Sequence, residues 1–398
     1  MSNRVRTLLT MLMLILLASS AFVAGYFTND FVELRSGGTI VRAASDFDLF
    51  WEAWDLVQNN FIGELPAPKA VTYSAIRGAI GSLNDPYTVF VEPVVRMEER
   101  EQLQGSFGGI GAYLSRPEDG GPVFLEPIPG NPAELAGIVI GDILLAVDGV
   151  EITADMTVAA IVEMVKGEKG TSVVLTVLHP GESDPVDIEV ERDDILIPSV
   201  TYRLLTEDEE IGYIQLTRFS GESTNEIQAA LTDLVEQGAD KLILDLRNNG
   251  GGLLDAAVDV ADHFLDQGPV LYQQTQGEAE RTYESSDETL MPDLPLVVLV
   301  NGGTASASEI LAGALRDRER AVLIGQRTFG KGSVQLVFDL SDGSSVHVTS
   351  ARWFTPDRHQ LDQQGLEPDI AVEITQEAID NGRDQILNRA IEYLQNGS

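Results

Sequence analysis

Two predominantly apolar runs, each ended by a glycine-rich turn, constrain the fold of this chain most. Lys241 to Leu246 (KLILDL) is followed by Asn248 to Gly252 (NNGGG), and Leu294 to Val300 (LPLVVLV) by Asn301 to Gly303 (NGG). Strands that are buried on both faces show such runs, whereas a strand with one face in water alternates. Patterns typical of helices lie between the runs, so we expect an α/β fold in which helices cover a sheet.

A serine stands at the turn that follows the second run. The sequence continues there with a helix from about Ala307 to Arg316 and a short strand at Ala321 to Ile324. Ser306 precedes the helix, at a strand-to-helix turn where its hydroxyl is exposed and helix N–H groups point outward. Ser306 and Glu309 also fit an S-x-x-E capping box. The residues alone therefore leave two roles for Ser306, helix cap and nucleophile, and these can coexist.

A lysine between two glycines is the second candidate. Lys331 lies in the sequence Gly330-Lys331-Gly332, which predicts close backbone packing around it, although an isolated lysine is more often a solvated surface residue. We hypothesise that Ser306 and Lys331 meet as nucleophile and base. A lysine accepts the serine proton only when it is neutral, and burial in apolar surroundings lowers its pKa towards that state. Phe329 and Val334 are expected to supply apolar walls.

Three separated motifs carry a resemblance to a known family. TASASEI (304–310), GKGSVQ (330–335) and DLRNNGGG (245–252) resemble the carboxy-terminal processing (tail-specific) peptidases, and the resemblance extends from about Asp48 to the C-terminus. It implies a Ser/Lys dyad formed by Ser306 and Lys331, with Gln335 assisting the lysine. Thr304 stands where many relatives carry serine. The implied fold class is multi-domain α+β, with a crotonase-like ββα-superhelix core of α/β type.

The pocket for the oxyanion is expected to be built from backbone N–H groups. Ala307 follows the proposed nucleophile at a helix start, and is one donor. The turn at Gly251 and Gly252 is the second donor by family resemblance. The same glycines are equally expected in a tight strand-to-helix turn without any catalytic role.

The block from Gly105 to about Asp193 looks like an inserted PDZ domain. Its opening, Phe107-Gly108-Gly109-Ile110-Gly111, resembles the loop whose N–H groups bind the C-terminal carboxylate of a peptide. Glycines let a carboxylate approach the main chain closely, although turn chemistry explains them as well. The strand from Ile110 to Leu114 is expected to accept the peptide by edge pairing. A family-derived hypothesis is that this domain gates the site.

Composition excludes several classes of function. The chain has 63 acidic and 26 basic residues, a net charge of −37, and such a surface repels nucleic acid. The absence of cysteine excludes a thiol nucleophile and thiolate metal ligands. No H-x-x-x-H pair occurs, so we expect neither a metal site nor a cofactor. The four histidines are expected on the surface or in loops: His179, His263, His347 and His359.

The N-terminus resembles a targeting segment. Arg4 and Arg6 precede an apolar run from Leu8 to Phe27, about the ~20 residues that span a bilayer. Small residues at 18–20 also offer a cleavage site, so a signal anchor and a signal peptide both remain open. The basic residues before the run predict that the body of the protein lies outside the cytoplasm, on the periplasmic or extracellular side. The protein is therefore expected to be membrane-anchored, or secreted if the segment is cleaved.

The expected layout has five parts. Residues 1–30 form the signal segment, 31–104 a tether and helical region, 105–193 the PDZ domain, 194–375 the peptidase core and 376–398 a C-terminal helix. Thr375 is expected to cap one helix from Gln376 to Leu394 that packs back on the N-terminal helices. The aromatic face of the helix that begins at Ser45 is expected to be core or a dimer contact; its members are Phe47, Phe50, Trp51, Trp54 and Val57.

These observations predict a serine endopeptidase that binds protein or peptide C-terminal tails through its PDZ domain and cleaves through an acyl-enzyme. The alternative is a catalytically silent PDZ scaffold, against which the intact Ser306, Lys331 and Gln335 argue. A crotonase-type enzyme acting on acyl-CoA is the third reading. An extracytoplasmic address and a PDZ domain both argue against it.

Overall fold

The computed structural model describes residues 44–397 apart from 118, 119, 288 and 292. The expected signal segment and most of the tether lie outside this range. No helix in the described part of the chain is both long and apolar enough to cross a membrane. The described residues divide into two compact units, one that ends at Val71 and one that begins at Thr72, and the two are considered separately.

The first described helix carries the expected aromatic face. Helix α2 (Ala44–Asn60) begins one residue before the predicted start. The ring of Phe50 contacts those of Phe47 and Trp51, with centroids 5.8 and 5.2 Å away. Phe47 and Trp51 are still 65% and 55% exposed in the single chain. Helix α3 (Pro68–Gly81) follows in sequence.

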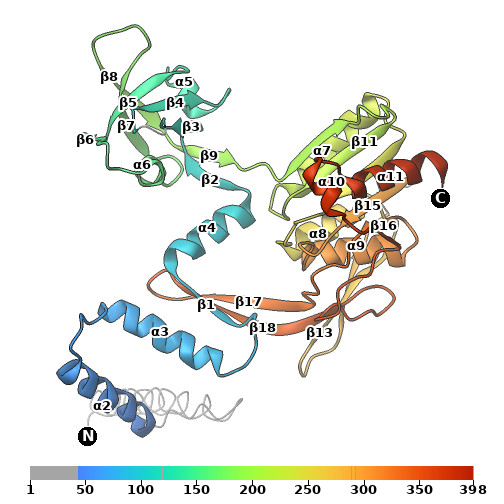
Figure 1. The fold of residues 1–398 in the computed structure, drawn as a ribbon, viewed down its shortest axis with the longest axis horizontal. Coiled ribbons are helices and arrows are strands. Elements are labelled where there is room, and N and C mark those ends of the chain that lie inside the picture. Colours follow the sequence, from blue (N-terminus) through green and yellow to red (C-terminus); the bar gives the residue numbers. More distant parts are fainter. Residues whose placement is uncertain (1–43, 118–119, 288, 292, 398) are drawn as a thin grey trace, which may run out of the picture. The chain divides into compact units, whose positions relative to one another are not determined.

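A six-stranded sheet forms the centre of the second unit (Figure 1). The strand order is β10-β11-β12-β15-β16-β19, and only β10 runs antiparallel to its neighbour. The bounds are Val200–Leu204, Ile211–Leu216, Lys241–Asp245, Leu296–Val300, Val322–Gly325 and Ile370–Ala371. The two apolar runs are therefore the adjacent parallel strands β12 and β15.

Both faces of β12 and β15 are buried, as the apolar runs predict. Leu242 and Leu244 belong to a core shared with three helices, α7 (Ser223–Glu236), α8 (Leu254–Asp262) and α9 (Ala307–Asp317). Ile243, between them, belongs to a core on the opposite face with α11 (Gln385–Asn396). Successive residues of a strand point to opposite faces, so the apolar residues of β12 and β15 alternate between these two cores.

The C-terminal region differs from the single helix expected. Thr375 does cap a helix, but α10 (Gln376–Asp380) is short, and α11 begins only at Gln385. Asp384 caps α11 by accepting a hydrogen bond from the amide of Leu387 at 3.0 Å. Helix α11 packs on β15 and β16 of the central sheet. An aspartate offers the backbone a local alternative to helix, which is why the break falls there.

A second sheet is antiparallel and combines strands that come before and after Ser306 in sequence. Strands β17 (Ser333–Asp339) and β18 (Ser345–Phe354) form a hairpin. Strand β18 also pairs with β1 (Val89–Val91) and with β13 (Gly268–Thr275), which pairs with β14 (Arg281–Ser285). Helix α4 (Pro93–Gln104) follows β1 and leads to the expected PDZ block.

The PDZ block has its own sheet and core. Its strand order is β3-β4-β5-β7-β8, with β6 on β5, and the helices are α5 (Pro132–Leu135) and α6 (Val158–Val165). The strands are Ala112–Ser115, Val123–Pro127, Asp142–Val147, Ser172–Leu178, Val186–Glu191 and, for β6, Val150–Glu151. Strand β3 lies at the end of this order, so one of its edges is unpaired among the described strands.

One expectation about the PDZ block is wrong. Phe107 to Gly109 is not a loop, because these residues belong to strand β2 (Ser106–Gly109), which pairs with β9 (Asp193–Leu196). Gly108 lies so close to Gly167 that a Cβ atom on it would be 2.0 Å from the carbonyl oxygen. The glycines therefore serve close backbone packing here, and only Ile110 and Gly111 remain as the turn before β3.

Candidate active site

The carboxyl ends of four adjacent parallel strands meet at one pocket. β11 leads to Phe219, β12 to the turn at Gly250–Gly252, β15 to Ser306 and β16 to Lys331. In parallel sheets these ends lie at the same edge, and ligands bind there. All of these residues, together with Gln335, line a cavity of about 420 Å³. Segments far apart in sequence are thus brought together by the strand order.

Ser306 has an unusual backbone conformation. Its φ of 57° and ψ of −118° lie in a region that residues other than glycine seldom occupy, and the residue is 8% exposed. A residue held in such a conformation costs about 1–3 kcal/mol, and residues of this kind cluster at functional sites. The turn connects β15 to α9, and Ser306 itself lines the pocket.

Glu309 connects the serine to the lysine through the main chain. Its carboxylate is fully buried. Oε2 accepts hydrogen bonds from the amides of Ser306 at 3.0 Å and Lys331 at 2.8 Å. Oε1 accepts from Thr328 Oγ1 at 2.5 Å and from the amide of Gly330 at 2.8 Å. The glutamate half of the expected capping box is therefore present, and the same carboxylate also fixes the lysine loop.

Lys331 is packed between its two glycines as expected. A Cβ atom on Gly332 would lie 2.1 Å from the amide nitrogen of Asp362. Burial lowers the pKa of Lys331, while the negative charge of Glu99 opposes this by raising it. The ammonium nitrogen lies 5.6 Å from the centre of the Tyr87 ring.

Only one of the two expected apolar walls is present. Val334 lines the pocket, but Phe329 does not and is 58% exposed. The amide of Phe329 donates to the carbonyl of Thr304 at 2.9 Å, which fixes the backbone of the loop there. Tyr87 covers the lysine instead.

The glycine turn lies directly against the serine. A Cβ atom on Gly251 would be 2.9 Å from Cβ of Ser306 and 3.0 Å from the amide nitrogen of Ala307. The amide of Gly251 donates to Oδ1 of Asn249 at 2.9 Å, so it is occupied. Within the described chain, the amides of Gly252 and Ala307 donate no hydrogen bond. These two remain open as oxyanion donors.

Gln335 lines the pocket but does not contact the lysine. Its amide nitrogen donates to Ser333, at 2.9 Å to Oγ and 3.3 Å to the carbonyl oxygen. Across the described residues, no hydrogen bond joins Lys331 to Ser306 or to Gln335. The structure thus brings the three predicted side chains into one cavity without connecting them.

Four ionisable residues of the pocket were missed: Arg96, Glu99, Arg218 and His347. His347, expected on the surface, lines the pocket with its side chain 16% exposed, and burial lowers its pKa. Glu99 of α4 lines the same pocket, with Oε2 3.4 Å from Nε2 of His347. The spacing of Arg96, Glu99 and Leu103 is the one available signal, because i, i+3 and i+7 share a helix face.

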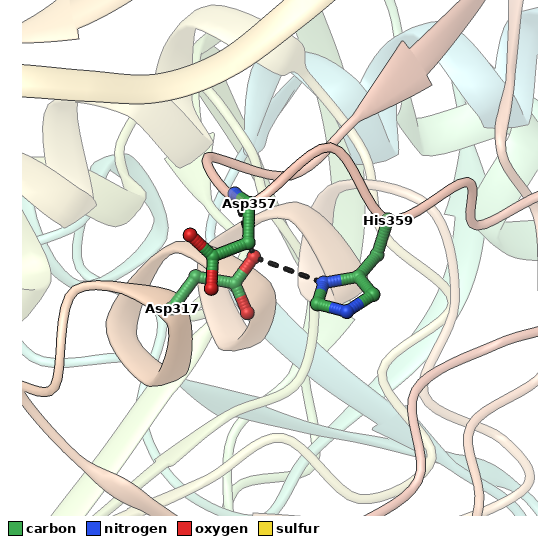
Figure 2. A group of neighbouring side chains, drawn as sticks. All are labelled: Asp317, Asp357 and His359. Carbon is green, nitrogen blue, oxygen red and sulfur yellow. Dashed lines mark hydrogen bonds and ion pairs between the residues drawn. The ribbon is translucent and has the colours of Figure 1, made fainter.

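A group of possible metal ligands lies outside the pocket. One ligand atom from each of Asp317, Asp357 and His359 falls within 4.8 Å of the others (Figure 2). Asp317 already accepts hydrogen bonds from Thr355 and the amide of Asp357, and pairs with Arg316. Burial alone would raise the pKa of Asp317, but these donors lower it overall. We interpret the carboxylate as a structural link between α9 and the segment after β18.

Of the five residues expected to form the carboxylate-binding loop of the PDZ block, two, Ile110 and Gly111, lie in a turn. The carbonyls of Ile110 and Gly111 accept hydrogen bonds from Ala133 at 2.8 Å and Ile128 at 2.9 Å. Their amides donate to no backbone carbonyl of the described chain. Asn131 occupies the space that a Cβ atom on Gly111 would need. The turn precedes β3, whose outer edge is unpaired in the described structure.

Comparison with known proteins gives a consistent result. Residues 210–372 match Peptidase family S41, and residues 123–178 match the PDZ domain. A carboxyl-terminal-processing protease of Picosynechococcus is 37% identical over 341 residues, which cover 85% of this chain and 82% of that protein. A carboxy-terminal processing protease of Bacillus subtilis is 35% identical over 330 residues, covering 83% and 70%.

Two further relatives carry related names. A chloroplastic C-terminal processing peptidase of Tetradesmus obliquus is 36% identical over 85% of this chain and 76% of its own length. Among solved structures, a photosystem II D1 C-terminal processing protease is 36% identical, covers 80% of this chain and 86% of its own, and has a TM-score of 0.47. The identities and coverage of the sequence relatives decide the assignment: the chain belongs to peptidase family S41, as a PDZ-containing serine-type peptidase of the carboxyl-terminal-processing group.

Proposed function

We propose that this protein is an endopeptidase that cleaves tailed protein substrates through an acyl-enzyme on Ser306, with Lys331 as the base. The observation that supports this most is the shared pocket at the carboxyl ends of β12, β15 and β16. It contains Ser306, Lys331 and the glycine turn. A nucleophile, a desolvated amine and open backbone amides are the groups that acyl transfer requires.

The proposed reaction proceeds in two stages. Neutral Lys331 takes the proton of Ser306 as Oγ attacks the scissile carbonyl carbon, and the amides of Gly252 and Ala307 stabilise the oxyanion. Lys331 then gives the proton to the leaving amine, and the acyl-enzyme remains. Water, deprotonated by the same lysine, hydrolyses the ester and restores Ser306. Gln335 holds the amine without adding charge, once its side chain turns from Ser333.

Lysine suits this role only where its proton is readily lost. Burial lowers the pKa of Lys331 from that of free lysine, so the neutral form is reached at lower pH. The activity of the base rises as pH increases through this pKa, because only the deprotonated amine accepts a proton. Glu309 supports the geometry by holding the amides of both proposed catalytic residues.

The PDZ domain is proposed to select the substrate. The amides at Ile110 and Gly111 bind the C-terminal carboxylate of a tail, and the free edge of β3 pairs with the preceding residues. Phe107, Gly108 and Gly109 contribute indirectly, by fixing this turn through β2 and β9. Substrates are therefore proteins or peptides with an accessible C-terminus.

The N-terminal segment is proposed to place the enzyme at the membrane. An apolar run after two arginines supports a membrane anchor or a cleaved signal peptide, with the catalytic part on the periplasmic or extracellular side. The exposed aromatic face of α2 supports a homodimer, because large exposed apolar patches often mark protein contacts. The net charge of −37 argues against a nucleic-acid partner.

The first experiment is cleavage of an unfolded or tailed model protein by the full chain beside Ser306→Ala and Lys331→Ala. We expect each substitution to lower kcat by at least about 10³-fold while the variants remain folded by circular dichroism. Substantial activity in Lys331→Ala would show that another base operates, and His347 in the same pocket would be the next candidate.

The silent scaffold remains the rival of this proposal. The lack of a hydrogen bond from Lys331 to Ser306 or Gln335, within the described residues, is the observation in its favour. If the wild-type protein binds tail peptides but does not cleave, a fluorophosphonate probe separates the readings. Labelling that is lost in Ser306→Ala supports an enzyme that is at rest, whereas no labelling at any pH supports the scaffold.

A further inference from the structure

The catalytic pocket contains a carboxylate that the proposed reaction does not use. Glu99 of α4 is the sole acidic side chain among the described residues that line this pocket. It comes from a helix that precedes the PDZ block, more than 200 residues before Ser306 in sequence. A negative charge beside a general-base lysine is unexpected, because it favours the protonated amine, which cannot accept a proton.

Glu99 and its neighbour are also poorly satisfied. Oε2 of Glu99 and Nε2 of His347 are both buried and make no hydrogen bond in the described structure. The two atoms are 3.4 Å apart, and Nη1 of Arg96 lies 3.7 Å from Glu99. Leaving a buried polar group without a hydrogen bond costs about 1–3 kcal/mol. Such groups call for an explanation, and a functional role is one.

The ionisable groups around Lys331 lie on several neighbouring elements. Glu99 is the opposite charge that raises the pKa of Lys331, against the stronger effect of burial. Burial is the largest cause that lowers the pKa of His347, and the positive charges of Arg96 and Lys331 lower it further. The other ionisable groups close to the lysine or the pocket are Tyr87, Arg218, Glu309, Asp339 and Asp362.

Glu309 and Asp362 are placed differently from Glu99. The carboxylate of Glu309 is saturated by four donors, including the Lys331 amide. Burial is the main cause that raises the pKa of the Tyr87 hydroxyl, and the negative charges of Asp362 and Glu309 raise it further. Asp339 is held by Arg96 and Arg100. Among these described carboxylates near the base, Glu99 is therefore the one with a buried oxygen that makes no hydrogen bond.

Resting on the function proposed above, we propose that Glu99 is a positioning residue that sets the protonation state of Lys331. While α4 holds Glu99 in the pocket, its negative charge favours the ammonium form of Lys331, so a smaller fraction of the dyad is ready to react. When Glu99 moves away from the lysine, more of the ammonium ions lose a proton to solvent water, and a larger fraction of neutral amine can accept the proton of Ser306. Glu99 itself touches neither the substrate nor the reacting atoms.

The position of α4 is fixed from two sides. Arg96 and Arg100 bond to Asp339 of β17 at 3.0 and 2.6 Å. Glu101 bonds to Lys166, which follows α6, at 2.8 Å. Only Gly105, in a left-handed conformation, separates α4 from β2. A displacement at either side therefore moves Glu99 relative to the pocket.

The test is the pH dependence of Ser306 labelling by a fluorophosphonate probe in the full-length protein. This reaction needs the activated serine but neither a tail nor a protein substrate. In Glu99→Gln we expect the midpoint of the rising limb to move down by about half a unit to one unit, with an unchanged plateau at high pH. Below the wild-type midpoint, labelling becomes about threefold to tenfold faster.

Two variants provide matched controls. Glu98→Gln makes the same charge change at the neighbouring, exposed position of α4, outside the pocket, and should leave the profile unchanged. Glu99→Asp keeps the charge on a shorter side chain and should retain a midpoint above that of Glu99→Gln. A merely structural role for Glu99 would lower the plateau in both Glu99 variants without moving the midpoint.

A second measurement covers the case in which Glu99→Gln folds poorly. In Ser306→Ala protein with ¹³C-labelled lysine, the Lys331 signal, assigned by its loss in Lys331→Arg, reports the titration directly by NMR. The expected result is a lower midpoint when Glu99→Gln is added. Coincident profiles in both measurements would overturn the role of Glu99. Labelling that persists in Lys331→Ala would instead overturn the dyad, so the two failures are distinguishable.

Discussion

Glu309 is the residue on which the geometry of the proposed dyad depends most directly. Its buried carboxylate accepts four hydrogen bonds, two of them from the amides of Ser306 and Lys331. The capping pattern predicts one of these contacts, because a capping box is local. The bonds to Thr328, Gly330 and Lys331 arise only because β16 lies beside β15.

Glu309→Gln tests this role. The amide nitrogen of glutamine faces N–H donors, so at least two donors lose their acceptor inside the protein. We expect the free energy of unfolding to fall by about 1–3 kcal/mol and kcat to fall more than KM changes. Thermal unfolding and steady-state kinetics measure these effects.

The control for this substitution is Glu319→Gln, which changes an exposed carboxylate just after α9. It should leave both stability and turnover near wild type. Unchanged turnover in Glu309→Gln would contradict a positioning role, even if the protein were less stable.

Among the elements, the turn between β12 and α8 has a strict steric requirement beside the serine. Gly251 has φ of 102° and lies against the backbone and Cβ of the Ser306 segment. Its neighbour Gly250 has open space, because a methyl group at that position would have no heavy atom within 4 Å. The glycine run therefore contains positions of very different importance, which the sequence NNGGG does not distinguish.

Gly251→Ala should separate these positions. A methyl group there contacts Ser306 at 2.9 Å, in a backbone conformation that alanine rarely adopts. A shift of the serine by about 1 Å is enough to lower kcat/KM by about 100-fold. Gly250→Ala, the matched control, should stay within about threefold. Equal activity of the two variants would show that the turn does not position the serine.

At the scale of the whole molecule, the chain connects the PDZ block to the rest of the protein at two points, one before β2 and one after β9. The block has its own hydrophobic core. Its two ends are adjacent, because the amide of Ile197 donates to the carbonyl of Gly105 at 2.7 Å. Helix α4 enters the block and carries Glu99, so the block and the pocket share one element.

Replacing residues 106–196 with a short Gly-Ser linker tests the coupling. We expect turnover of an unfolded substrate without a preferred tail to rise severalfold, because α4 loses its bond from Glu101 to Lys166 and Glu99 is less firmly held. A peptide-cleavage assay at fixed pH measures the change. Loss of turnover in a folded deletion protein would exclude gating by this block.

The sequence by itself determined the main elements around the pocket and the candidate residues in it. Unbroken apolar runs predict β12 and β15, and the resemblance of three motifs to a known family makes Ser306 and Lys331 the candidates for nucleophile and base. These signals are local, because burial on both faces and the turn glycines are written within a few residues of each other. The family resemblance added the PDZ block and the serine peptidase assignment, which the comparisons support.

Tertiary structure alone decided what surrounds those residues. His347 lies in the pocket because β18 pairs with β17, and Glu99 reaches it because α4 packs beside that hairpin. The amide of Gly251 is occupied by Asn249, and Phe329, expected as an apolar wall, is exposed and does not line the pocket. Contacts between segments far apart in sequence depend on which strands pair and which faces pack, and periodicity within one segment carries no information about them.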